Sequence, residues 1–215
     1  DFRFRSLPYA KQDANKYFQS DGAYVSDVVE RRGFNSTNEL INHTPVAEIA
    51  LDFWRQYQYT GDLVFLKEKA LPFILEAAKF FDSLFVLEAD GYYHAKEGSG
   101  YEGWIHLKDG LTELVYGNVL FSVALKALQT VGMDIPEAKK WKEILGKLAP
   151  VKLVKADSRS IEQVGGKYIL KTGYFNGEEL SSDMITSAGW GIKEKEWLNV
   201  YNPADNGSYF GLKLL

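Results

Sequence analysis

The sequence predicts a mainly α-helical fold of αα-hairpins, followed by a C-terminal third with loops and short strands. Up to about residue 150, apolar side chains recur at helical spacing between helix-start and helix-stop residues. Beyond Val151, short alternating stretches lie between turns rich in Gly and Asn. We therefore expect a helical segment over residues 1–150. Residues 151–215 are expected to be an irregular, β-containing segment packed on or inserted into the same domain.

The first helix is predicted over residues 7–19, and Ser20-Asp21-Gly22 ends it. A polar stretch follows from Ala23 to His43 and contains Arg31-Arg32-Gly33. Loops of this length in compact domains are usually functional or disordered. The arginine pair is interpreted mainly as exposed charge, with a substrate clamp as the alternative.

An αα-hairpin is predicted next. Thr44 is expected to be the N-cap of its first helix, with Pro45 at the first helical position. Thr60-Gly61 ends that helix, and Asp62 caps the second one. Pro72 lies inside the second apolar pattern, so a kink or a break is expected there, because proline lacks the N–H that a helix needs.

Beyond the hairpin, residues 88–91 predict a turn and residues 92–94 a short extended piece. Residues 95–108 form a Gly-rich loop before a helix expected over residues 109–130, with Asp109 as its N-cap.

A shorter helix is expected to start at Asp134 as N-cap, with Pro136 near its start, and to end before Pro150. In the last third, Val164-Gly165-Gly166-Lys167-Tyr168 has the pattern of a β-hairpin.

Composition excludes several classes of function. The net charge of −4 argues against nucleic acid as a partner, since phosphate binding needs a basic face. There is no polybasic run and no stretch of about 18 apolar residues, so we expect no membrane partner. The absence of Cys excludes disulfides and thiolate metal sites. No nucleotide-binding or GxSxG motif is present, so we expect no cofactor.

Aromatic residues are unusually frequent, at 14% of the chain. Most rings are expected in the core, but some are candidates for stacking on the apolar faces of sugar rings. Glu102 is the first candidate for catalysis, because its neighbours Gly100, Tyr101, Gly103 and Trp104 combine close backbone approach with desolvating rings. Desolvation raises the pKa of a carboxyl group, as a general acid near neutral pH requires. The alternative is an ordinary solvated loop glutamate.

Glu97 and Asp109 flank Glu102, and glycoside hydrolysis needs two carboxyl functions. Asp109 is interpreted as mainly structural because of its expected capping role. His94 and His106, with Glu97 and Glu102 between them, match no zinc-binding spacing, so we expect no metal.

The segment 45–62 and the segment from Phe65 to Phe81 resemble a helical hairpin of the α-L-fucosidase-type inverting glycoside hydrolases. The resemblance covers about residues 7–150, and it implies an (α/α)6-barrel catalytic domain. In that family an acidic-Gly turn precedes the general-acid glutamate by about twelve residues. Here Asp90-Gly91 is the turn, and the resemblance assigns the acid role to Glu102.

Two features depart from the family pattern. The family surrounds its acid with Ser-Pro-Glu-Asn, whereas this chain has Gly100-Tyr101-Glu102-Gly103. The Asn-X-Asn motif that activates water in the family is not found, and the role is not carried over to Asn35 or Asn38. A ring of twelve helices needs more than roughly 300 residues, so the chain is expected to be either a decayed relative or a part of such a ring that pairs with the remainder of a larger chain.

The leading hypothesis is therefore a glycoside hydrolase of oligo- or polysaccharides, inverting by resemblance, with Glu102 as general acid. Two alternatives remain open: a non-catalytic carbohydrate-binding or scaffold module of the same fold, and a polysaccharide lyase with Tyr101 or His94 as base. The sequence has no signal-peptide pattern and leaves the compartment unknown, although a bacterial glycan-degrading enzyme is expected to be secreted or periplasmic. The candidate substrate-binding residues are Tyr101, Trp104, Glu97, His43 and Trp54.

Overall fold

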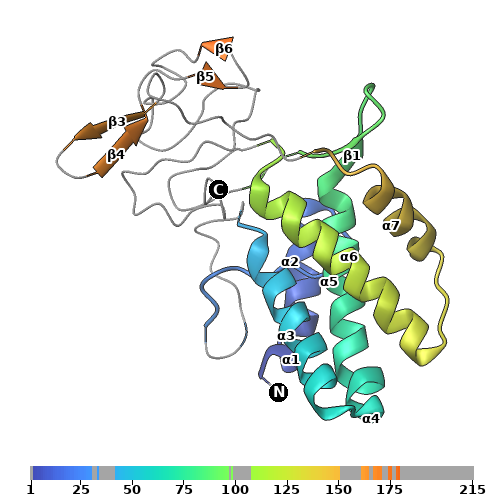
Figure 1. The fold of residues 1–215 in the computed structure, drawn as a ribbon. Coiled ribbons are helices and arrows are strands. Elements are labelled where there is room, and N and C mark those ends of the chain that lie inside the picture. Colours follow the sequence, from blue (N-terminus) through green and yellow to red (C-terminus); the bar gives the residue numbers. More distant parts are fainter. Residues whose placement is uncertain are drawn as a thin grey trace.

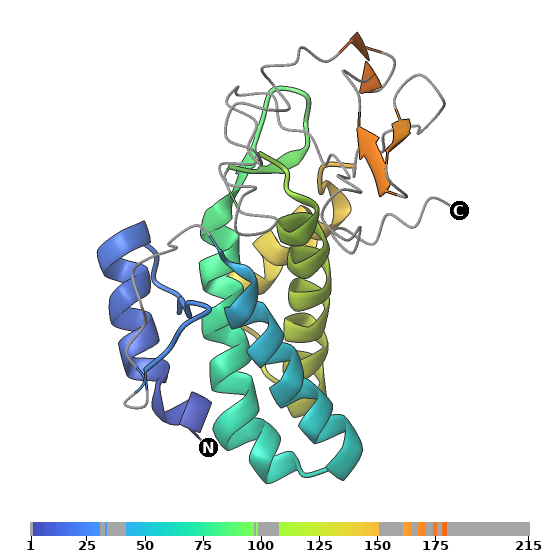
Figure 2. The same ribbon diagram turned by 90° about the vertical axis from the view of Figure 1, so that its left-hand side faces the viewer.

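The computed structural model describes residues 2–30, 33, 42–96, 98 and 108–150, together with the backbone of four short strands between residues 161 and 179. Three helices pack pairwise at the centre of the helical part (Figure 1). They are α3 (Thr44–Thr60), α5 (Leu71–Leu84) and α6 (Leu111–Val131). On the outside, α2 (Leu7–Phe18) packs on α5, and α7 (Glu137–Gly146) packs on α6. A four-residue helix, α1 (Phe2–Arg5), precedes α2 (Figure 2).

The structure confirms the predicted αα-hairpin, which α3 and α5 form, except for the N-cap of α3. Gly61 ends α3 with a left-handed φ of 67°, which glycine adopts without steric cost. Asp62 then caps α4 (Leu63–Phe65), because its carboxylate accepts hydrogen bonds from the N–H groups of Val64 and Phe65, both at 2.9 Å. The tight connection makes α3 and α5 antiparallel neighbours.

Pro72 marks the expected irregularity. The five residues before α5 form a π-helical turn, η1 (Leu66–Ala70), and proline stands at the second position of α5. A wider turn accommodates a residue that lacks an N–H and whose ring would crowd the carbonyl four residues earlier. The predicted break is therefore a change of helix type within one continuous run.

Three predicted N-caps are wrong. Helix α3 begins at Thr44 itself, with His43 at the cap position, and Asn42 Oδ1 accepts from the Thr44 N–H at 3.3 Å and from its hydroxyl at 3.0 Å. Gly110, not Asp109, precedes α6, because Asp109 has a left-handed φ of 52° and uses its carboxylate elsewhere. Pro136, not Asp134, occupies the cap position of α7.

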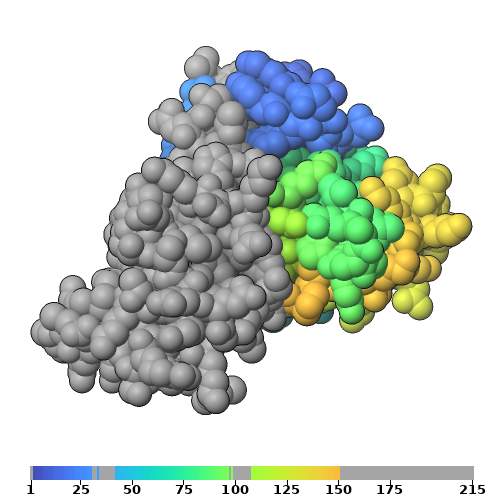
Figure 3. All heavy atoms as spheres, turned by 90° about the horizontal axis from the view of Figure 1, so that it is seen from above, coloured from blue at the N-terminus to red at the C-terminus, as the bar shows by residue number. Residues whose placement is uncertain are grey.

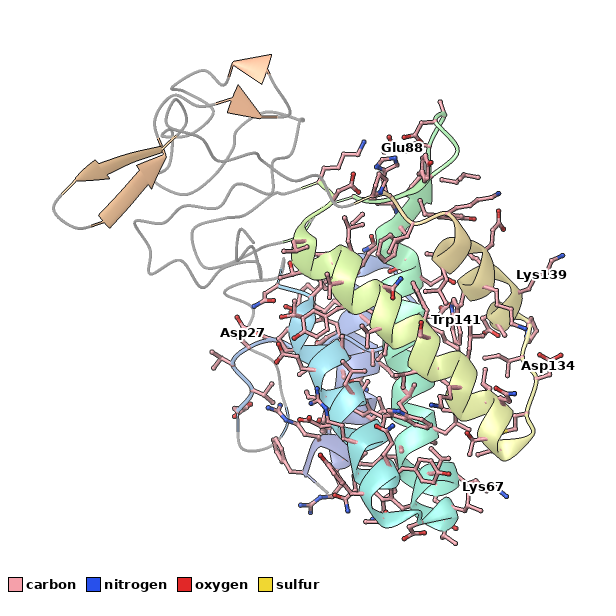
Figure 4. All side chains as sticks on the ribbon, viewed as in Figure 1. Asp27, Lys67, Glu88, Asp134, Lys139 and Trp141 are labelled. Carbon is pink, nitrogen blue, oxygen red and sulfur yellow. The ribbon has the colours of Figure 1, made fainter. Side chains whose placement is uncertain are left out.

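Most of the described aromatic rings belong to the core. Trp141 of α7 is fully buried, stacks on Phe121 with ring centroids 6.1 Å apart, and donates from Nε1 to Asp82 Oδ2 at 3.1 Å. The indole therefore connects α7 with both α6 and α5, and its polar atom has the partner that burial requires. Figure 4 shows Trp141 between these helices.

A short antiparallel hairpin connects α5 to α6. Strand β1 (Phe85–Leu87) pairs with β2 (Tyr93–Ala95) in the register Phe85 to Ala95 and Leu87 to Tyr93. The predicted turn between them has Gly91 at a φ of 86°. The hairpin reverses the chain, so α6 runs parallel to α3 and antiparallel to α5 (Figure 1). The N-terminal ends of α3 and α6 thus lie at the same end of the bundle as the C-terminal end of α5.

Two further hairpins occur beyond residue 150. Strand β3 (Ile161–Val164) pairs with β4 (Lys167–Leu170), with Val164 opposite Lys167 around the predicted Gly165-Gly166 turn. Strand β5 (Tyr174–Phe175) pairs with β6 (Glu178–Glu179). The β-containing character of this third is confirmed, while the division of the chain at residue 150 stays a prediction.

Within the described residues, α6 alone is long and apolar enough to cross a membrane, by length and composition only. The sequence pattern had not indicated such a run. The helix packs against α3, α5 and α7, and 39% of its apolar window is buried within the molecule. The expectation of no membrane partner stays a prediction.

Gly22 fixes the segment after α2 on α5. A Cβ at this position would lie 2.1 Å from Phe80 N and 2.5 Å from Glu76 O, and the next residue, Ala23, donates its N–H to Glu76 O at 2.9 Å. The obstacle is helix backbone, which cannot move aside as a flexible side chain can. The close approach therefore requires glycine.

We predict that Gly22→Ala lowers the free energy of unfolding by about 1–3 kcal/mol, because the added methyl group forces α5 and residues 20–25 apart. Urea denaturation measures this change. Gly146→Ala is the matched control, since nothing lies within 4 Å of its Cβ position. The control should leave stability unchanged or raise it by up to about 1 kcal/mol. Equal effects of the two substitutions would contradict the close packing of Gly22 on α5.

Candidate functional site

The polar groups with unusual surroundings gather at the end of the bundle where α3 and α6 begin and α5 ends. Figure 3 views this end, with the β1–β2 hairpin in green between the blue N-terminal helices and the yellow-to-orange α7. Glu88, in the turn of the hairpin, and Asp27, beside the start of α3, mark the same end in Figure 4. Asn42 donates to both carboxylate oxygens of Asp27 at 2.7 Å and so holds the chain that enters α3.

His94 lies between two carboxylates. Its Nδ1 is 2.6 Å from Asp109 Oδ2, and its Nε2 is 2.9 Å from Asp90 Oδ2. Only the protonated imidazolium donates from both nitrogens at once, so this geometry favours the charged ring. His94 and Asp109 are both buried, and Asp109 is 1% exposed.

The pKa values of the three groups reflect this arrangement. Burial lowers the pKa of His94, but the hydrogen bonds to Asp109 and Asp90 outweigh burial, so its pKa lies above the ordinary value. Burial raises the pKa of Asp109, and the interaction with His94 offsets this only in part. The Tyr92 N–H, followed by the His94 ring, lowers the pKa of Asp90.

Asp109 also joins the two ends of the Gly-rich segment 96–108. Its Oδ1 accepts from the Ala95 N–H at 2.8 Å, and its own N–H donates to Ala95 O at 2.9 Å. The Lys96 N–H donates to Leu84 O at 3.0 Å, and Lys108 Nζ lies 2.7 Å from Glu88. The chain thus leaves and re-enters the bundle at one place, above the end of α5.

The segment 96–108 carries four of the predicted site residues. Glu97, Tyr101, Glu102 and Trp104 lie outside the described residues, as does His106, so their roles stay predictions. Gly98 is described and buried. Among the described residues, no three His, Asp or Glu side chains form a group that could hold a metal ion.

His43 lies inside the core, next to a buried carboxylate. It is 2% exposed, its ring centroid is 5.6 Å from those of Phe18 and Phe80, and its Nδ1 is 3.7 Å from Glu113 Oε1. Glu113, in the first turn of α6, is 0% exposed. The structure therefore brings His43 to the base of segment 96–108 as a buried group rather than a surface one.

Trp54 lies elsewhere, in the middle of α3. It is 6% exposed and packs against Tyr57 with ring centroids 5.2 Å apart, and Lys126 Nζ lies 6.0 Å from its ring centroid. A ring that stacks on a sugar needs an open face, and most of this ring is covered by the bundle.

Two participants were missed from the sequence. Glu113 was not singled out, and Asp109 was interpreted as a cap rather than as the partner of His94. The available signals were Gly110 just before a helix whose third residue is Glu113, and His94 standing four residues after Asp90. Neither signal shows burial, which depends on distant parts of the chain.

We predict that His94 makes stability depend on pH. A pKa that is raised in the folded state contributes stability below the unfolded pKa, and this contribution is lost as pH rises through the folded value. Between about pH 6 and about pH 8.5, the free energy of unfolding measured by urea denaturation should therefore fall more for the wild type than for His94→Gln. An equal loss in both proteins would contradict the charged ring between Asp90 and Asp109.

Comparisons with known proteins agree with this fold. Residues 5–159 match the family described as "Glycosyl hydrolase family 95 catalytic domain". No curated protein sequence matches the chain. A solved structure described as "Putative kojibiose phosphorylase from human microbiome" is similar at a TM-score of 0.56 and 19% identity. The similarity covers 72% of this chain and 22% of that one, so the chain spans about a fifth of its length. The helices described above form part of an (α/α)-toroid-type fold, and the chain belongs to the catalytic-domain family of glycosyl hydrolase family 95.

Proposed function

We propose that the chain carries the general-acid segment of an inverting glycoside hydrolase with α-L-fucosidase-like specificity, and that Glu102 is the acid. One observation carries the proposal most directly. Segment 96–108 begins and ends at the His94–Asp109 pair, at the end of the bundle where α3 and α6 begin.

Chain connectivity supports this role for Glu102. Glu102 follows the buried Gly98 by four residues, and four residues of chain span at most about 14 Å. Chain connectivity therefore limits the Cα atom of Glu102 to within about 14 Å of that of Gly98, which packs on Glu113. In enzymes, catalytic groups are commonly carried by loops that a rigid scaffold positions.

The chemistry requires two groups on opposite faces of the sugar. In inversion, a protonated carboxyl group delivers its proton to the glycosidic oxygen, while a base activates water on the other face. Glu102 is proposed for the first role. Tyr101 and Trp104 would cover the apolar face of the sugar, and Glu97 would accept hydrogen bonds from its hydroxyl groups. His43 and Trp54 are buried, so the proposal gives them no contact with the sugar.

The lyase alternative loses one of its two bases. Both ring nitrogens of His94 are engaged by carboxylates, and the pKa of His94 is raised, so the ring is a poor proton acceptor. The binding-module alternative is favoured by two sequence observations, the lack of an Asn-X-Asn motif and a chain too short for a complete ring of twelve helices. It predicts glycan binding without hydrolysis.

We predict that Glu102→Gln lowers kcat/KM for glycosides with alkyl leaving groups by about 10²- to 10⁴-fold, because the amide cannot donate the proton. The measurement is hydrolysis of a panel of alkyl and aryl glycosides, α-L-fucosides included. Proton NMR of the first-formed sugar reports its anomeric configuration, and inversion is expected. Circular dichroism should show an unchanged fold.

Glu97→Gln is the matched control, because it changes a second carboxyl group of the same segment. It should affect KM more than kcat. Equal losses for both variants would contradict the assignment of the acid to Glu102. Glycan binding by the wild type without any hydrolysis would contradict catalysis and support the binding module.

A further inference from the structure

A buried carboxylate lies against Gly98, which precedes Glu102 by four residues in the chain. Glu113 is 0% exposed, and a Cβ built on Gly98 would lie 2.1 Å from its Cδ and 2.3 Å and 2.5 Å from its two oxygens. A Cβ on Gly110 would lie 2.2 Å from Oε2. The carboxylate therefore lies against the backbone at Gly98 and at Gly110, and a side chain at either position would force this carboxylate to move.

The surroundings of Glu113 hold its carboxylate in place. Its Oε2 accepts from the Thr112 hydroxyl at 2.8 Å. Its Oε1 faces His43 Nδ1 at 3.7 Å, a distance that suits an ion pair but is longer than a hydrogen bond. Within the described part of the chain, these two atoms have no hydrogen-bond partner. The position in the first turn of α6 favours a negative charge.

Burial of such a carboxyl group lowers the stability of the fold, so its presence here points to a functional role. Removing a carboxyl group from water is unfavourable, and of the two contacts described here only the one with the Thr112 hydroxyl is a hydrogen bond. Fold stability alone would be served as well by an apolar side chain of similar volume. Full burial also means that Glu113 does not touch a substrate, so it cannot act as a second catalytic carboxylate.

We propose that Glu113 is a positioning residue for the general acid. Its carboxylate, oriented by His43, fixes the backbone at Gly98 and Gly110 and thereby the path of the chain through Glu102. The inference rests on the proposed function of Glu102 and goes beyond it, because it names what determines the place of the acid.

The kinetic test uses two leaving groups. The dinitrophenolate group of a dinitrophenyl glycoside leaves without much help from an acid. The alcohol of an alkyl glycoside leaves only when its oxygen receives a proton. Glu113→Gln keeps the size of the side chain but removes its charge. It should lower kcat/KM for the alkyl substrate by about tenfold and leave the dinitrophenyl substrate within about threefold. A general loss of structure would lower both rates alike.

Glu48→Gln is the matched control. Glu48 of α3 accepts a hydrogen bond from Tyr116 of α6 at 2.9 Å, so this variant also removes a charge between the same two helices. Its carboxylate is not among the atoms nearest to Gly98 or Gly110, so this variant should change neither rate. Equal losses on both substrates with Glu113→Gln, or no loss on either, would overturn the proposal.

Gly98→Ala tests the contact between Gly98 and Glu113 by changing the glycine. It is the variant to use if Glu113→Gln fails to fold. The methyl group would displace the chain from the carboxylate, so the alkyl substrate should again lose more than the dinitrophenyl one. Gly146→Ala, which has open space at its Cβ position, should keep both rates. Wild-type kinetics for Gly98→Ala would overturn the proposal.

Hydrogen exchange separates this inference from the proposed function, because it needs no activity. Amides in a peptide spanning residues 97–107 should exchange faster in Glu113→Gln than in the wild type or Glu48→Gln. Unchanged exchange would overturn the positioning role whether or not the chain hydrolyses glycosides. If Glu113→Gln exchanges faster but the wild type hydrolyses no glycoside, the positioning of the segment by Glu113 is supported and only the catalytic role of Glu102 is rejected.

Discussion

The geometry at the end of the bundle where α3 and α6 begin depends on the side chain of Asp109. Its carboxylate accepts from the Ala95 N–H and pairs with His94, while its own N–H donates to Ala95 O. These contacts close segment 96–108 at its base, and they require the left-handed backbone of Asp109, with a φ of 52°. They connect strand β2 with the residue that precedes Gly110 and α6. The strained conformation persists because several hydrogen bonds together over-determine it.

Two buried acid–histidine pairs therefore support one segment. The pair His94–Asp109 lies at the entry and exit of the chain, and the pair His43–Glu113 lies beneath Gly98. The helices explain why these pairs meet, since antiparallel α5 places the starts of α3 and α6 at one end. A rigid bundle with core rings such as Phe80 and Trp141 then serves as the scaffold on which a loop carries the chemistry.

The sequence predicts the features that depend on near neighbours. The cap by Asp62, the irregularity at Pro72 and the Gly165-Gly166 hairpin follow from the chemistry of single residues or short motifs. The cap assigned to Asp109 failed because its partner, His94, is 15 residues away. Burial of Glu113 also depends on distant contacts, so its sequence context reveals only an acidic residue in the first turn of a helix.

The pH dependence of kcat/KM for an alkyl glycoside tests the central claim most directly, namely that Glu102 is the proton donor of a glycosidase. The account predicts that the wild-type rate falls on the alkaline side as one carboxylic acid ionises. The residual rate of Glu102→Gln should lack this fall, since no acid remains to ionise. The same alkaline fall in both proteins would contradict the account, because another group would then deliver the proton.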